Sequence, residues 1–285
     1  MITNETLLRH IPNYIAPGFN ETTLLEKLQP FVEAAEHWAD TDICPREIVA
    51  DNQKLSALLD DVIAIRTLCF SAPMLDVTMH PNGLAVVNTE SLAPASAERS
   101  KAFIVSMHGH LLDYIDVFID EITEYAREPG QPEQYTEIRA KWSGSVPARN
   151  IWLATIFQNC NQIVRHTGIN KTLPDVMNSL QVIKYHESLM AERWISPELM
   201  EVLRRKQFPE EYWIEYSHLL FILRRDLEMF ISCKKPIAHL EMRQAVQLIR
   251  SNPHAFPQWH KSATARLFDP PVFRNKKKSG GYFFF

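Results

Sequence analysis

A chain of 285 residues, of which 46% are hydrophobic and 22% are charged, has globular composition and is long enough for one large domain or two medium ones. Its formal net charge of -4 excludes the global excess of positive charge with which proteins bind nucleic acid or anionic membranes. It has only 8 glycines and none of the glycine-rich motifs that cradle phosphates or present a nucleophilic serine. The easily recognised nucleotide-binding and hydrolase classes are therefore excluded as well.

The cysteines and the apolar runs indicate where the protein works. The cysteines are scattered without a C-x-x-C pair, so we expect reduced thiols and no structural zinc: Cys44, Cys69, Cys160 and Cys233. The first residues lack the basic start and apolar block of a signal peptide, and no run approaches the ~18 apolar residues of a membrane span. We expect a cytoplasmic protein, or a particle assembled there, with no cofactor, no membrane partner and no specific nucleic-acid binding.

Helical periodicity dominates the first 75 residues. A helix is expected from an N-cap at Thr22 or Thr23, with Glu26 behind it, to about residues 37–39. Two helices follow: a short one from Arg46 and a strongly apolar one that ends at about Ser71. Because this last helix is so rich in apolar residues, we expect it to be central in the fold.

Two β-type runs flank Pro81-Asn82-Gly83 within residues 75–88. Since Asn-Gly tolerates the positive φ values of tight hairpins, we expect a small β-hairpin inserted among helices. The next predicted helix is long, about 96–127, with Pro94 near its first turn. Its apolar stripe consists of Phe103, Ile104, Met107, Leu111, Tyr114, Ile115, Phe118, Ile122 and Tyr125.

The region after this helix is weakly patterned, so the sequence predicts a domain boundary there. Further helices are expected at about 151–165, 174–194, 197–206, 210–231 and 236–251. The predicted parts are an N-terminal helical domain with the inserted hairpin (1–128), a linker-like segment (129–150), a C-terminal helical domain (151–268) and an extended tail (269–285). The predicted fold is mainly α and bundle-like. A similar order of parts around Pro45 and Pro197 is compatible with two diverged helical halves.

Two clusters resemble metal sites in composition but not in spacing. His108 and His110, near Asp113, lie two positions apart, which on a helix puts their side chains on nearly opposite sides. The acidic residues and the histidine at 33–37 lack the Glu-x-x-His spacing of a di-iron helix. We therefore expect no metal site and no catalytic residues.

The charged stretches have two interpretations. Acidic residues at helical spacing form either a stripe that faces a basic partner or an ordinary solvated face: Asp113, Asp116, Asp120, Glu121 and Glu124. Basic runs in the second half serve inter-subunit salt bridges or phosphates, or only solubility: Arg204-Arg205-Lys206, Arg224-Arg225 and Lys234-Lys235. The sequence favours the ordinary solvated interpretation in both cases.

The last residues are the strongest candidate for a partner-binding element. A basic run, Lys276 to Lys278, and a glycine pair precede four consecutive aromatic residues: Tyr282, Phe283, Phe284 and Phe285. Four exposed aromatics would promote aggregation, so they need cover from another subunit or from this chain's own core, unless they are a non-natural addition. We favour docking on another subunit, through strand addition or insertion into a pocket.

Residues 72–99 contain a distinctive series of motifs. An apolar helix ends at Ala72-Pro73, Leu75-Asp76-Val77 leads to Asn82-Gly83 and a valine-rich run, and A-P-A-S-x-E-R at 93–99 opens the long helix. Together with residues 252–262, 273–275 and 280–285, this series resembles a protein family of Bacteroidetes bacteria and their phages and prophages. The resemblance covers most of the chain in order.

The resemblance implies a head-tail connector or neck adaptor, a virion structural protein that forms a ring between portal and tail and has no catalytic residues. The implied partners are phage portal, tail or neck proteins and further copies of the chain in a homo-oligomeric ring. The implied location is the bacterial cytoplasm during assembly and then the virion neck. Lys276 to Lys278 replace the acidic residues usual in the family's tail, which leaves its family-specific contact open. The alternatives are a host helical adaptor protein and an enzyme with dispersed acidic and histidine residues.

Overall fold

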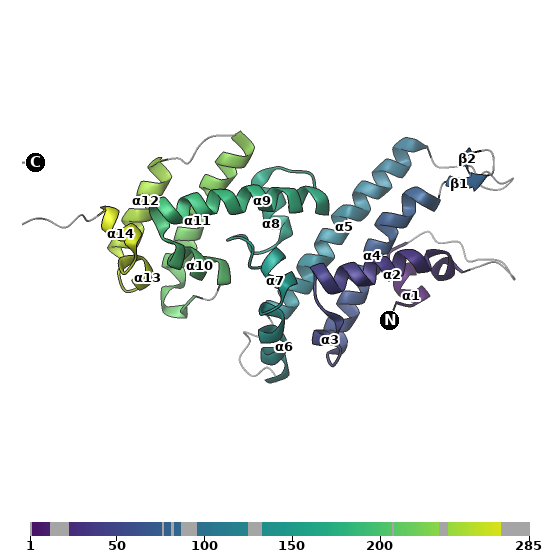
Figure 1. Cartoon of the computed structure of the whole chain (residues 1–285), viewed down its shortest axis with the longest axis horizontal. Helices are drawn as coiled ribbons and strands as arrows, with labels where there is room; N and C mark the ends of the chain where they lie inside the picture. Colours follow the sequence, from purple (N-terminus) through teal and green to yellow (C-terminus); the bar gives the residue numbers. More distant parts are fainter. Residues whose placement is uncertain are drawn as a thin grey trace, which may run out of the picture. The chain divides into compact units, whose positions relative to one another are not determined.

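A computed structural model describes residues 2–11, 23–75, 77–80, 83–86, 96–124, 133–206, 208–233 and 239–268 (Figure 1). The protein is mainly helical, as the sequence predicts. It forms two compact units, Met1–Lys184 and Tyr185–Phe285.

The first helices of the N-terminal unit are α1 (Asn4–Leu8), α2 (Leu24–Asp42), α3 (Arg46–Val49), α4 (Gln53–Leu75) and α5 (Ala97–Glu124). α2 begins with a capping box, which confirms the predicted cap at Thr23. The Thr23 Oγ1 accepts from the Glu26 backbone N–H at 3.3 Å, and the Glu26 carboxylate accepts from the Thr23 N–H at 2.7 Å. A cap of this kind stabilises a helix by ~1 kcal/mol.

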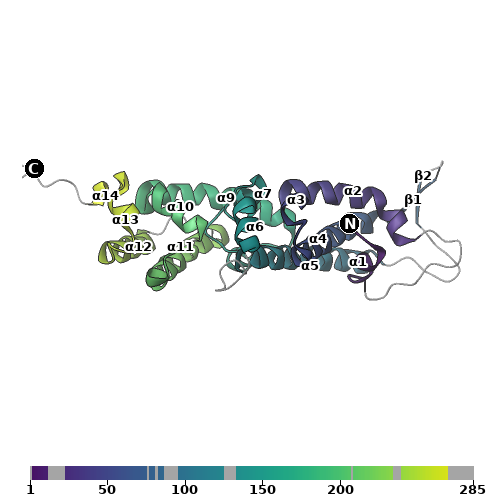
Figure 2. The same cartoon turned by 90° about the horizontal axis from the view of Figure 1, so that it is seen from below.

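α4 is the central helix of this unit, as predicted from its apolar composition. It packs against both α2 and α5, and α4 and α5 run side by side in both views (Figures 1 and 2). Its fully buried side chains include Leu55, Leu59, Val62, Ile63 and Ile65. Because each of these contributes ~1.5–3 kcal/mol on burial, α4 supplies much of the stability of the unit.

α5 buries only part of its predicted apolar stripe. Met107, Leu111, Ile115, Phe118 and Ile122 are buried, but Phe103 is 42% exposed, and Tyr125 lies outside the described residues. Phe70 and Met74 in the last turns of α4 are exposed as well. The buried part of the stripe therefore starts at Met107 rather than at the beginning of α5.

α5 is also the one helix in the described ranges whose length and composition would let it cross a membrane, over Ala97–Thr123. Core helices share these two properties, so they are weak evidence for a membrane span. In this structure α5 packs against α4, α6 (Glu133–Ser143) and α8 (Cys160–Thr167).

The region predicted as a hairpin contains two short backbone strands, β1 (Val77–His80) and β2 (Gly83–Val86). They pair antiparallel, with Val77 opposite Val86 and His80 opposite Gly83. The residues that join them, Pro81 and Asn82, lie outside the described residues, as do the side chains of both strands. The tight Asn-Gly turn and the hairpin as a packed element therefore stay predictions.

The segment expected to be linker-like, 129–150, contains helix in its described part. α6 (Glu133–Ser143) and α7 (Val146–Ile151) lie within or overlap it, and both belong to the N-terminal unit. The Trp142 indole is buried and donates a hydrogen bond to the Ile43 carbonyl at 2.9 Å. Both helices are too short or too polar to show a clear apolar period, so the sequence pattern did not predict them.

The helix predicted over 151–165 is interrupted. The chain leaves α7 at Ile151, and α8 (Cys160–Thr167) starts only after irregular backbone. The helix is interrupted because α8 has its own N-cap: the Asn159 side chain accepts from the Gln162 N–H at 3.0 Å. The two units divide at Lys184, within α9 (Leu173–Met190), rather than at the predicted boundary.

The C-terminal unit continues with η2 (Ala191–Ile195), α10 (Pro197–Arg205), η3 (Glu210–Tyr212), α11 (Trp213–Cys233), α12 (His239–Ser251), α13 (Pro257–His260) and α14 (Ala263–Phe268). Ser196 adopts a positive φ of 74° and caps α10, since its Oγ accepts from the Leu199 N–H at 3.2 Å.

The short helices α13 and α14 were not predicted, because four and six residues are too few for a readable period. Aromatic hydrogen bonds join this part of the chain to the rest of its unit. The Trp259 indole donates to the Trp194 carbonyl at 2.8 Å, and the Tyr216 hydroxyl donates to the Ala255 carbonyl at 2.9 Å. The C-terminal core therefore extends well beyond Ser251.

We predict that Trp142→Phe lowers the free energy of unfolding by about 1–3 kcal/mol, because the buried Ile43 carbonyl loses its donor. Trp213→Phe is the control, since Trp213 is 48% exposed and a surface change of this kind stays within ~0.5 kcal/mol. Urea unfolding of both variants measures the difference. Equal, negligible effects would mean that residues 133–151 do not belong to the core.

Candidate binding site around Arg66

The site residues predicted from the sequence, Tyr282 to Phe285, lie outside the described residues, as does the whole tail from 269 to 285. Their partner-binding role stays a prediction. The other predicted clusters can be placed, and the structure shows what each does within its own unit.

His108, His110 and Asp113 have separate surroundings. The His110 ring contacts His10 and Tyr114, with centroids 5.6 and 4.8 Å away. Asp113 instead accepts from the Lys171 ammonium at 2.6 Å. The pKa of His108 is lowered by burial and by the positive charge of Arg66. In the described part of the chain, no group of three or more histidines, cysteines or acidic residues is arranged to hold a metal ion.

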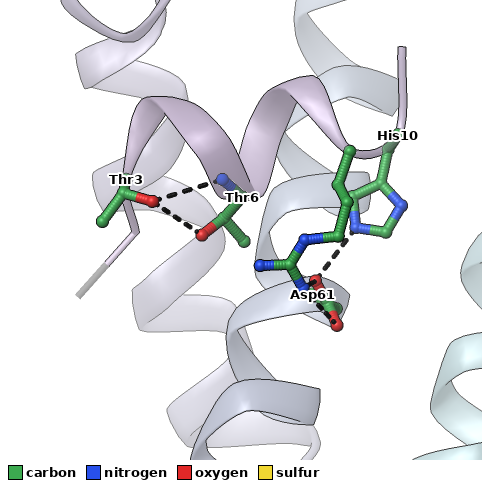
Figure 3. A network of polar contacts seen from close by, with 5 residues as sticks. Thr3, Thr6, His10 and Asp61 are labelled. Carbon is green, nitrogen blue, oxygen red and sulfur yellow. Dashed lines mark hydrogen bonds and ion pairs between the residues drawn. The ribbon is translucent and has the colours of Figure 1, made fainter. Parts of the chain in front are cut away.

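His10 instead fastens the N-terminal segment to α4. Its Nε2 lies 3.1 Å from the Asp61 carboxylate, and the Arg9 guanidinium donates to the same carboxylate at 3.2 Å. Figure 3 shows His10 and Asp61 facing each other, beside the Thr3 cap of α1. Asp61 is a buried carboxylate on α4 and is paired within the chain, so this polar network has a structural role.

The acidic stripe on α5 is used inside the chain. The buried carboxylate of Asp116 accepts from the backbone N–H groups of Cys160 and Asn161, both at 2.8 Å, and so caps α8. Burial raises the pKa of Asp116, and the hydrogen bonds from Asn161 and Cys160 partly offset this. Glu121 pairs with Lys54 at 2.7 Å. Asp113 is bound to Lys171. Asp113, Asp116 and Glu121 therefore all contact groups of the same chain and do not form a free acidic face.

The basic runs of the second half are not simply solubilising. The Arg204 guanidinium donates to the fully buried Glu187 carboxylate at 2.8 Å. Burial lowers the pKa of Arg224 to about 10, against the opposing effect of Glu187. His186 and Asp226, both buried, lie 3.0 Å apart in the same unit. The expectation of solvated charge is therefore corrected for Arg204 and Arg224, while Lys234 and Lys235 lie outside the described residues.

The remaining feature is a charged residue that the sequence pattern did not single out. Arg66, on the apolar helix α4, has its guanidinium carbon 4.4 Å from the Trp38 ring centroid and 3.9 Å from that of Phe70. Within the described ranges it makes no hydrogen bond or ion pair. Burial lowers the pKa of Arg66, although the Cys69 thiol and Asp42 favour its charged form.

Two open pockets meet at Trp38 and Arg66, and together we call them the Arg66 groove. The smaller, of about 110 Å³, is lined by Phe31, Ala34, Ala35, Trp38, Arg66 and Phe70. The larger, of about 310 Å³, is lined by Trp38, Asp42, Arg66, Ile151, Leu173, Pro174 and Met177. All of these residues belong to the N-terminal unit. An apolar groove that contains a few polar groups is the usual form of a binding site.

The thiols are unsuited to nucleophilic chemistry. Cys44, Cys69 and Cys160 are buried. Burial raises the pKa of Cys44 to about 12 and that of Cys69 to about 11. At neutral pH both therefore stay protonated and unreactive.

We predict that Asp116→Asn lowers the free energy of unfolding by about 2 kcal/mol, because hydrogen bonds to a charged acceptor are worth ~1.5–3 kcal/mol and an amide cannot accept from all the same donors. Asp113→Asn is the matched control on the same helix. Its carboxylate is 47% exposed and bonds Lys171, so a loss below ~1 kcal/mol is expected. Chemical unfolding of the two variants tests this, and a larger loss for Asp113→Asn would contradict the capping role.

Comparison with known proteins finds similarity to one family over part of the chain, and that family has no known activity. Residues 16–128 match the model of a family of unknown function (DUF6712). No curated protein and no solved structure matched the chain. The matched range contains Phe31, Trp38, Arg66 and Phe70, but neither α9 nor the C-terminal unit. The chain is thus similar to this family over the range that contains α2, α3, α4 and α5.

Proposed function

We propose that this protein is a structural subunit of a phage neck, a head-tail connector or adaptor that acts by binding other protein subunits. The proposal starts from the motifs at 72–99 and near the C-terminus, which resemble a family of Bacteroidetes phages and prophages. The mainly helical fold is compatible with it. The finer elements, an inserted hairpin at 75–88 and two diverged helical halves, belong to the same proposal.

The observation that supports a binding role best is the set of exposed apolar side chains that share helix faces. In the N-terminal unit, Phe70 and Met74 are four residues apart on α4 and are 50% and 64% exposed. In the C-terminal unit, Ile214 and Phe221 are seven residues apart on α11 and are 78% and 64% exposed. Single exposed apolar residues need no explanation, but paired ones on one helix face are typical of protein interfaces.

The polar groups described above have structural roles, which fits a subunit better than an enzyme. Asp61 holds the N-terminal segment, Asp116 caps α8, and Glu187 binds Arg204. None of them is directed into the Arg66 groove, whose lining is mostly apolar and aromatic. A site of this composition binds side chains rather than activating a substrate.

In this proposal the chain acts in the bacterial cytoplasm during assembly and then in the virion neck. It forms a homo-oligomeric ring against the portal and contacts tail or neck proteins, without a cofactor. The tail residues Tyr282 to Phe285 insert into a neighbouring subunit, while Lys276 to Lys278 stay at the solvated rim. Buried aromatics anchor interfaces, whereas rim charges mainly affect the rate of encounter and its salt dependence.

The ring is expected to form on its partner and not before. No sustained heptad pattern predicts strong self-association, so the isolated chain should be monomeric or weakly associated. Purified protein mixed with portal complexes from the same phage should give portal-bound rings by electron microscopy. A stable closed oligomer of the isolated chain, formed without portal, would contradict this order of assembly.

Deletion of Tyr282 to Phe285 should leave the Tm of the isolated protein almost unchanged and prevent its incorporation into particles. The reason is that these aromatics are proposed to be covered only in the assembly. Replacement of Lys276, Lys277 and Lys278 by Ser should have a much smaller effect on incorporation. A fall in Tm by many degrees after the deletion would place the aromatics in the chain's own core instead.

A further inference from the structure

We propose that the Arg66 groove of one copy is the receptor for the aromatic segment Tyr282 to Phe285 of another copy. This inference rests on the proposed neck function, because it identifies the surface on which the tail of a neighbouring subunit docks. A tail that binds the body of the next subunit makes a heterologous contact, and such contacts generate rings when the rotation closes.

The chemistry of the groove matches aromatic side chains. Trp38 and Phe70 already hold the Arg66 guanidinium between them, at 4.4 and 3.9 Å. Arg66 has no hydrogen bond or ion pair to another described residue that would bind its N–H groups elsewhere. An additional ring can therefore pack against the exposed part of Phe70 and gain apolar burial and an aromatic contact.

The size of the groove fits side chains better than a larger ligand. Its larger pocket, of about 310 Å³, is at the lower end of the range for ligand sites, ~300–1,000 Å³. The smaller pocket, of about 110 Å³, lies against Phe70, which is still 50% exposed. Consecutive aromatic side chains from one peptide are suited to filling these two adjoining pockets.

The charge of α2 favours this segment over other apolar peptides. Between Leu24 and Asp42, α2 carries five acidic residues and one lysine, and it lines both pockets. Of these acidic residues Asp42 lines the groove, whereas Glu33 and Asp40 are exposed on the opposite face of the helix. The tail presents three lysines shortly before its aromatics, so a lysine can approach Asp42 at the larger pocket while the rings enter the groove. The sequence contains no other run of three lysines followed by four aromatics.

The chain available is long enough to reach a neighbour. Residues 269–285 follow the last described residue of α14, and when extended they span up to about 60 Å. Gly280 and Gly281 separate the lysines from the aromatics, which lets the two parts meet α2 and the pockets independently.

The test uses the full chain with Tyr282, Phe283, Phe284 and Phe285 replaced by Ser, so that no internal tail competes. A fluorescein-labelled peptide of residues 269–285 is titrated with this protein, and its anisotropy is measured. We expect saturable binding with a micromolar Kd, and none for a peptide in which the four aromatics are Ser. Absence of saturable binding up to roughly 500 μM protein would overturn the proposal.

Two variants of the receptor chain locate the binding. Phe70→Ser should weaken the peptide by about tenfold or more, because it removes one wall of the aromatic array. Ala34→Arg should do the same by filling the smaller pocket from an exposed helical position that tolerates arginine. Tyr185→Ser, at an exposed tyrosine on α9 of the C-terminal unit, is the control and should leave the Kd unchanged. Equal losses in all three, or no loss in the first two, would contradict the assignment.

The wild-type chain separates binding in trans from binding in cis. At protein concentrations below the Kd, the affinity of the wild-type chain for the peptide should equal that of the variant with the Ser tail. A more than tenfold weaker affinity would show that each groove is occupied by its own tail, which overturns the role of a second copy. If the peptide fails to bind but deletion of the aromatics still prevents incorporation into particles, the neck function stands and the tail docks on a different subunit.

Discussion

Burial of α4 is the interaction on which the N-terminal unit depends. This helix is in contact with α1, α2, α3 and α5, and it contributes fully buried aliphatic residues along most of its length. The neighbouring helices therefore take their positions from one apolar surface. Its few polar positions are informative for that reason: Asp61 binds His10 and Arg9, whereas Arg66 is held only by aromatic rings. A half-buried guanidinium that forms no direct ion pair within the described residues is costly in a core and suited to an interface.

The sequence predicted the elements whose signals are local or periodic. The capping box at Thr23 and the apolar helix to Leu75 are examples, because each depends on residues close together in the chain. It failed where distant residues decide the structure. Asp116 of α5 caps α8, more than forty residues later, and Trp142 bonds the carbonyl of Ile43. No local pattern contains these contacts, so 129–150 was interpreted as linker-like and 151–165 as one helix.

The same limit applies to the candidate site. Arg66 lies within the strongly apolar run that predicts α4, and nothing in its neighbourhood in the sequence indicates that Trp38 lies against it. One signal was available: arginine is seldom found on a strongly apolar helix unless it has a partner or a function. The tail is the opposite case. Its composition alone predicted a binding element, but composition does not specify the surface that receives it. The fold supplies a surface of complementary chemistry on α2 and α4.

The most direct measurement of the central claim is a cryo-electron microscopy map of the neck assembled on its portal. The account predicts a ring of this chain in which the aromatic segment of each subunit lies against Trp38, Arg66 and Phe70 of the adjacent one. A neck that lacks the protein would contradict the proposed function. A ring in which every groove is empty while the tails dock elsewhere would contradict the proposed contact and leave the ring itself in place.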